Sequence, residues 1–105
     1  MNTPEPPYTL VAFTSVRRPG GDEAYDAAAA HMEELAAQQP GYLGIESVRG
    51  VDGSGITLSY WRTAEDARAW KGVAEHREVQ RRGREEWYER WTVRVATVER
   101  EYGSG

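Results

Sequence analysis

The feature that most constrains the fold is the alternating stretch near the end of the chain, residues 91–102 (WTVRVATVEREY). Trp91, Val93 and Val95 are at alternate positions, and Arg94 lies between them at a position of the other set. A period of two over this length is typical of a β-strand with two different faces. The last element is therefore predicted to be a strand, and the earlier segments must supply its sheet.

The segment before this strand is predicted to be helical. Thr63, followed three residues later by Asp66, resembles a capping box, so a helix is expected to begin near Ala64. The Lys-Gly pair at 71–72 is expected to break that helix, and a second segment is expected over about 73–86. The basic and acidic residues of that second segment alternate at helical spacing, which predicts a solvent-exposed face.

Four elements are expected upstream. Asp22 is a candidate N-cap for the first helix, whose apolar stripe runs from Tyr25 to Ala36 at helical spacing. The predicted elements are a strand over 8–16, a helix over 23–39, a strand over 42–49 and, after an Asp-Gly turn, a strand over 56–61.

The resulting order, β-α-β-β-α-β, predicts an α+β fold of the ferredoxin-like type: a four-stranded antiparallel sheet with both helices on one face. We expect one domain over residues 8–102, a disordered lead-in over 1–7 and a short tail over 103–105. Three of the strands carry apolar residues on both faces, whereas two helices cover only one. The simplest solution is face-to-face packing with a second copy, which makes a homodimer.

Composition excludes several functions. The chain has 105 residues and a net charge of -4, so nucleic-acid binding has no support. It has no cysteine, which excludes disulfides, thiolate catalysis and zinc fingers. No apolar run approaches the roughly 20 residues of a membrane span, and no signal peptide is evident, so we expect no membrane partner and a cytoplasmic location. His31 and the nearby glutamates do not have metal-ligand spacing, so no metal site is predicted.

Three runs of the sequence resemble the antibiotic biosynthesis monooxygenase family of dimeric α+β barrel proteins. They are GYLGIESVRG with VDGSGITLSYW, the helical AWK and AEH, and GREEWYERWTVRVATVEREY. The resemblance implies a cavity between the helices and the sheet. Some members there oxidise anthrone-type aromatics to quinones with dioxygen and without metal or flavin, and others degrade haem. Trp70 matches the tryptophan of the haem-degrading branch, but the branch's asparagine is absent, since Thr14 and Ser15 stand in its place.

A cofactor-free oxygenase needs a base, a cation or hydrogen-bond donor for the oxyanion, and aromatic walls. His76 is the candidate base, Arg94 the candidate cation, and Trp70 the third candidate catalytic residue. The candidate substrate-binding residues are Tyr60, Trp61 and Tyr88. No cofactor is expected.

Each of these residues also has a structural interpretation. His76 could be a surface histidine in a charged helix, Arg94 could form a salt bridge at a dimer interface, and Trp70 could belong to the core. A one-residue shift of the third strand would exchange Tyr60 and Trp61 between the faces. Two functions of different classes therefore remain: a monooxygenase acting on a hydrophobic hydroxyaromatic molecule, or a non-catalytic binding or structural dimer of the same fold. A haem-binding or haem-degrading monooxygenase is a third option.

Overall fold

The computed structural model describes residues 4–76 and 86–104, with the side chains of residues 74–76 left undescribed. Its elements follow the expected order. They are β1 (Tyr8–Arg17), α1 (Asp22–Ala37), β2 (Tyr42–Arg49), β3 (Ser54–Trp61), α2 (Ala64–His76) and β4 (Tyr88–Val98).

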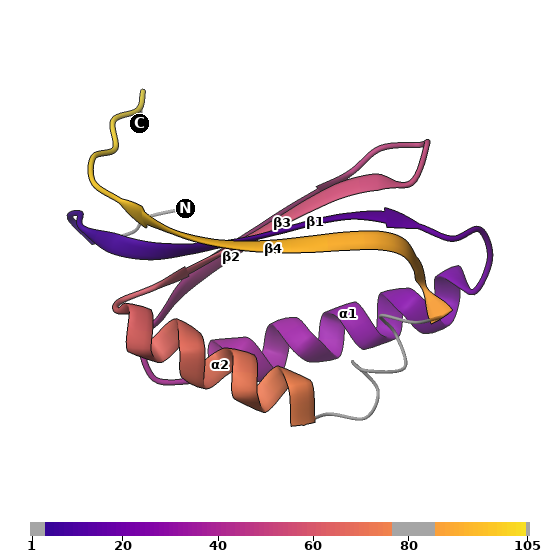
Figure 1. Cartoon of the computed structure of the whole chain (residues 1–105), viewed down its shortest axis with the longest axis horizontal. Helices are drawn as coiled ribbons and strands as arrows, with labels where there is room; N and C mark the ends of the chain where they lie inside the picture. The colour runs from indigo at the N-terminus through magenta and orange to yellow at the C-terminus, as the bar shows by residue number, and fades with distance from the viewer. Residues whose placement is uncertain (1–3, 77–85, 105) are drawn as a thin grey trace.

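The strands form one four-stranded antiparallel sheet with the spatial order β2-β3-β1-β4. Both helices lie on the same side of this sheet, and none of the described helices or strands covers the other side (Figure 1). The predicted α+β, ferredoxin-like architecture is therefore confirmed. Within the described residues, no helix has the length and apolar character that crossing a membrane requires.

The two helices begin differently. In α2, the Thr63 cap is confirmed, because the backbone N–H of Asp66 donates to Thr63 Oγ1 over 3.1 Å. In α1, the predicted Asp22 cap is wrong: Asp22 is already helical, and the cap is Gly21 in the left-handed region, with φ of 67° and no side-chain cap hydrogen bond. A glycine adopts this conformation at no steric cost, which explains its place at the start of α1.

The predicted break in the second helix is also wrong. α2 continues through Lys71 and Gly72 as far as His76. A glycine in a helix costs only about 1 kcal/mol relative to alanine, which the packing of Ala67 and Trp70 on the core can offset. Most of the predicted second segment, residues 77–85, lies outside the described residues.

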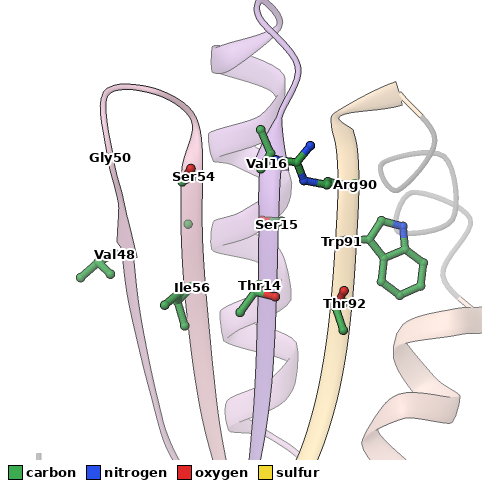
Figure 2. Close-up of a pocket in the computed structure, with 11 residues that line it drawn as sticks. Thr14, Ser15, Val16, Val48, Gly50, Ser54, Ile56, Arg90, Trp91 and Thr92 are labelled. Atoms are coloured by element: carbon green, nitrogen blue, oxygen red, sulfur yellow. The ribbon is translucent and has the colours of Figure 1, made fainter.

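Strand register assigns every strand residue to one of two faces, and the predicted alternation is confirmed. On the helix side, Trp61 pairs with Thr9 of β1 and with Tyr42 of β2. On the opposite side, which we call the open face, Ile56 pairs with Thr14 and with Val48. Figure 2 views the open face with α1 behind the sheet, where Val48, Ile56, Thr14 and Thr92 form a row across the four strands. A shallow depression of about 390 Å³ covers this region.

The core lies on the helix side and is small. Trp61 is fully buried and contacts Ala36 of α1 and Ala67 of α2. β4, in contrast, is exposed on both faces: Val93 and Val95 are 39% and 62% exposed on the helix side, and Arg94 is exposed on the open face.

Candidate active site

A tryptophan stack occupies one end of the helix side. The rings of Trp61 and Trp70 lie 5.7 Å apart with an interplanar angle of 22°, and Tyr42 meets Trp61 edge-on at 5.8 Å. The indole N–H of Trp61 donates to Ser59 Oγ over 2.9 Å, so its polar atom is satisfied in the core. The fully buried Trp61 therefore packs against one face of the Trp70 ring. Trp70 is half-buried, so it is the ring of the pair that can contact a ligand.

An apolar surface extends from this stack along β1 and β4. Val11 and Phe13 of β1 pair with Val95 and Val93 of β4, and all four lie on the helix side. The ring of Phe13 stacks on that of Trp91 at 6.2 Å and 27°, while Trp91 remains 40% exposed. Stacking rings beside exposed aliphatic side chains make a surface suited to a flat aromatic molecule.

A polar cluster occupies the other end of the helix side. Arg49 at the end of β2 donates from Nη2 to Ser15 Oγ over 2.9 Å and to the Tyr25 hydroxyl over 3.3 Å, and from Nη1 to the Gly53 carbonyl. The Tyr88 hydroxyl also donates to the Tyr25 hydroxyl, over 3.1 Å. The two edge strands, β2 and β4, thus meet the first turn of α1 at the hydroxyl oxygen of Tyr25.

Gly55 explains how Arg49 reaches this cluster. Gly55 lies directly opposite Arg49 in the β2–β3 hairpin and between Arg49 and Ser15 in the sheet. A Cβ at position 55 would lie 2.5 Å from Cζ of Arg49, which is closer than atoms can approach. The missing side chain therefore lets the arginine, which remains exposed, lie across β3 and reach Ser15.

A second arginine borders the same cluster. Cζ of Arg17 lies 3.9 Å from the centroid of the Tyr25 ring, and its Nη2 is 3.3 Å from Oδ1 of Asp22. The Arg17 side chain is only 7% exposed, and its buried Nε has no hydrogen-bond partner among the described residues. This arginine is therefore fixed by an ion pair and a cation–π contact.

The electrostatic surroundings keep Tyr88 protonated. Burial raises the pKa of Tyr88, and its hydrogen bond with Tyr25 raises it further, while Arg49 and Arg17 act in the opposite direction. Burial dominates, so Tyr88 is a hydroxyl donor at neutral pH.

The structure brings some of the sequence-predicted site residues together and separates others. Trp70 and Trp61 stack, and Tyr88 lies on the same side of the sheet at the polar cluster. Arg94 and Tyr60 lie on the open face, because they pair with Ala12 and Leu10, whose parity is opposite to that of Trp61. The expected convergence of Arg94 and Tyr60 with Trp70 therefore does not occur within one chain.

His76 is the last residue of α2, six residues beyond Trp70 and so about 9 Å further along the helix axis. Its side chain lies outside the described atoms. Among the described residues, no group of three or more histidine, aspartate and glutamate side chains is placed to hold a metal ion.

Tyr60 has its own environment on the open face. Its pKa is raised to about 12, mainly by burial and further by a hydrogen bond with Glu46 and by the charges of Glu46 and Glu101. Its ring meets that of Tyr8 edge-on at 5.8 Å, and the Tyr8 hydroxyl donates to Oε2 of Glu101 over 2.6 Å.

Comparison with known proteins assigns the chain to a family. The family model described as antibiotic biosynthesis monooxygenase matches residues 7–82. The chain belongs to this family. The uncharacterized protein YqjZ of Bacillus subtilis (strain 168) is 48% identical to this antibiotic biosynthesis monooxygenase family member over 99 residues, which cover 94% of this chain and 86% of YqjZ.

Solved structures share the fold at low identity. SnoaB of Streptomyces nogalater, described as a cofactor-independent oxygenase, superposes with a TM-score of 0.62 at 18% identity, covering 92% of this chain and 95% of SnoaB. A haem-degrading protein from Mycobacterium tuberculosis superposes with a TM-score of 0.61 at 17% identity, covering 92% of this chain and 98% of its own. These two structures support the family fold and differ in their described chemistry.

Sequence reasoning missed the polar cluster of this antibiotic biosynthesis monooxygenase family member. The sequence assigned Tyr25 to the apolar stripe of the first helix and placed Arg49 at the end of a strand, and only Tyr88 was singled out. The signal that could have found the cluster is the hairpin register, which places Gly55 opposite Arg49. A glycine opposite an arginine on a covered face indicates that the arginine is directed inward.

Proposed function

We propose that this protein is a cofactor-independent monooxygenase that oxidises a hydrophobic hydroxyaromatic or anthrone-type molecule with dioxygen on the helix side of its sheet. The observation that carries the proposal is the apolar surface of Trp91, Val93 and Val95, which is exposed on the same face as the Trp61–Trp70 stack. Family membership supports a monooxygenase, and the description of SnoaB supports chemistry without a cofactor.

The substrate supplies the electrons in this reaction. A base removes a proton from the activated ring carbon, and the carbanion passes one electron to dioxygen. Recombination forms a C–O bond and, after protonation, a hydroperoxide, which loses water as its O–O bond breaks and a carbonyl forms. The protein needs only to accept and return protons, stabilise the anion and exclude water.

In this proposal, Trp70 stacks on the substrate, and His76 is the base at the end of α2. Trp61 fixes the plane of Trp70 from behind, since it is fully buried and stacked on it. Tyr88 lies on the substrate side of the sheet and donates to the Tyr25 hydroxyl, which leaves the Tyr25 hydrogen for the substrate. Arg94 and Tyr60 act at the subunit interface instead, because they lie on the open face.

We also propose that the open face pairs with a second copy of the chain. Ile56 is 44% exposed and Val48 71% exposed on this face, and α1 and α2 both lie on the other side (Figure 1). Covering such a surface removes apolar area from water, which is the main source of stability in subunit contacts.

Charge indicates how two copies would be oriented. Glu46, Leu58, Ala12 and Arg94 form one row across the open face, with the two charges at opposite edges about 14 Å apart. A two-fold axis parallel to the strands places β4 over the partner's β2, so each Arg94 faces Glu46 of the partner subunit. A two-fold axis along the row instead places each Arg94 over the Arg94 of the partner subunit and each Glu46 over the partner's Glu46. Like charges then repel, so this orientation is disfavoured.

The test of the oxygenase proposal is oxygen uptake with an anthrone-type substrate and metal-stripped protein. We expect uptake that survives chelation, and a fall of about tenfold or more in kcat for His76→Ala or Trp70→Ala. Arg68→Ala is the matched control, because Arg68 is an exposed residue of α2 and should leave the rate unchanged. Uptake no faster than autoxidation, with protein that is folded and dimeric, would contradict the proposal.

That negative outcome would favour the alternative, a non-catalytic binding protein of the same fold. The observation that favours this alternative is the position of Arg94 and Tyr60, which leaves the tryptophan stack without the cation expected beside it. Ligand binding without turnover would then be the expected result.

A further inference from the structure

The polar cluster of Arg49, Tyr25 and Tyr88 has donor capacity that the fold does not use. Tyr25 accepts hydrogen bonds from Arg49 and Tyr88, and its own hydrogen has no acceptor among the described residues. Arg49 has five N–H donors, of which its three described contacts use three.

The charge of the cluster is likewise not balanced. Asp22 pairs with Arg17 over 3.3 Å. Arg49 has no carboxylate partner in the described structure, and its guanidinium contacts hydroxyl and carbonyl oxygens instead. A cation held by neutral acceptors keeps its attraction for an anion.

The cluster adjoins the aromatic surface. Arg49, Gly55, Ser15 and Trp91 form one row on the helix side, and Arg49 crosses Gly55 to reach Ser15. Trp91 pairs with Ser15, so its exposed ring lies one strand from the guanidinium. The edge of Phe13 meets Tyr88 at 5.2 Å, which joins the aromatic surface to the hydroxyl donors.

We propose that Arg49 and Tyr25 bind the acidic oxygen of an aromatic ligand whose rings lie against Trp91 and Val93, while Tyr88 orients the Tyr25 hydroxyl by donating to it. The ligand class is an aromatic anion, either a carboxylate or a phenolate. The inference rests on the proposed function for the aromatic surface, and it adds the group that selects the ligand and sets its orientation.

The direction of the ligand follows from the strand geometry. The row of Trp61 and the row of Arg49 are six residues apart along β3, or about 20 Å. A flat molecule of three or four rings is shorter than this distance. Held by its anion at Arg49, it reaches along Val93 and Val95 toward Trp70, so its far end is the end that reacts.

Two matched ligands test the site: anthraquinone-2-carboxylate and its neutral amide, which does not carry the negative charge. Binding is measured by equilibrium dialysis at low salt with the full chain. We expect the carboxylate to bind about tenfold more tightly than the amide, as a charge-assisted hydrogen bond in a partly buried site implies. Arg49→Met should remove this preference by weakening only the carboxylate.

Three further variants separate recognition from folding. Arg49→Lys keeps the positive charge but loses the paired N–H donors of the guanidinium, so it should retain part of the preference for the carboxylate over the amide. This variant also tests the site if Arg49→Met does not fold. Tyr25→Phe removes a hydroxyl without changing charge and should reduce the preference severalfold. Arg68→Met removes an exposed arginine of α2 and should leave both affinities unchanged.

The outcomes distinguish this proposal from the proposed function. Equal binding of the two ligands to the wild type, or equal loss of both in Arg49→Met, overturns the anion site and leaves the aromatic surface standing. Failure of both ligands to bind overturns the aromatic surface as well. Selective loss of the carboxylate in Arg49→Met, with unchanged thermal unfolding, supports the site.

Discussion

The two faces of the sheet differ in how their apolar residues are used. On the helix side, the fully buried Trp61 is packed between α1 and α2, and a polar cluster closes the far end. On the open face, Val48 and Ile56 are exposed and are covered by no element of the described chain, and the charged Glu46 and Arg94 lie at the two edges. The difference shows that the helix side both supplies the core at Trp61 and exposes an aromatic surface along β4, whereas the open face exposes apolar residues between its charged edges.

The largest expected effect contrasts two residues of β3. Trp61→Ala should lower the free energy of unfolding by about 3–5 kcal/mol, because it removes a fully buried ring and leaves a cavity. Ile56→Ala, on the open face and 44% exposed, should cost about 1 kcal/mol. Urea unfolding measures both, and equal losses would contradict the contrast between the faces.

The second effect concerns the proposed pairing of two copies through the open face. Arg94→Glu or Glu46→Arg alone should raise the dimer dissociation constant about tenfold or more, because each substitution brings like charges together across the row. The double variant should restore much of the affinity. Sedimentation equilibrium measures the constants, with Arg68→Glu as the control. If the double variant loses as much dimer affinity as the two single variants lose together, Arg94 and Glu46 do not contact each other across the interface.

The third effect separates stability from recognition on the helix side. Gly55→Ala places a methyl group 2.5 Å from Cζ of Arg49 in its present position, so the side chain must move. Because a guanidinium is the far end of a flexible side chain, the free energy of unfolding should fall by less than about 1 kcal/mol. The preference for the aromatic carboxylate should nevertheless be lost, as dialysis would show. A retained preference would mean that Arg49 does not need its path across β3.

The smallest effect is a pH dependence on the open face. The pKa of Tyr60 is raised in the folded protein to about 12, above the ordinary value of 10.0, so the folded state holds this proton more tightly than the unfolded state. The contribution is complete below pH 10 and is lost as pH rises toward about 12. Absorbance at alkaline pH should show one late-titrating tyrosine fewer in Tyr60→Phe, together with a shallower loss of stability. An unchanged titration would place the late group elsewhere.

Local patterns predicted most of the fold. Alternation identified both faces of β1, β3 and β4, and the spacing of the apolar stripe identified α1. The break at Gly72 was wrong because a single glycine costs too little to end a helix that is packed on Trp61. The choice between Tyr60 and Trp61 needed the pairing of Trp61 with Thr9, which no local pattern contains.

The candidate site was less predictable than the fold, because its members meet through register. Arg94 was expected beside Trp70, yet it pairs with Ala12 of β1 and therefore lies on the open face. Arg49 and Tyr25 come from different elements 24 residues apart, and they meet only because Gly55 clears the path between them. Sequence can identify residue types suited to chemistry, whereas pairing decides which of them share a face.

The double exposure of β4 has a consequence for the assembled protein. Val93 and Val95 would contact a bound aromatic molecule, while Arg94 between them would contact the partner subunit. Neighbouring residues on one strand share a single backbone, so a twist favoured by one contact changes the geometry of the other. Thermodynamic linkage then requires that a ligand which tightens the dimer is itself bound more tightly by the dimer, and by the same factor.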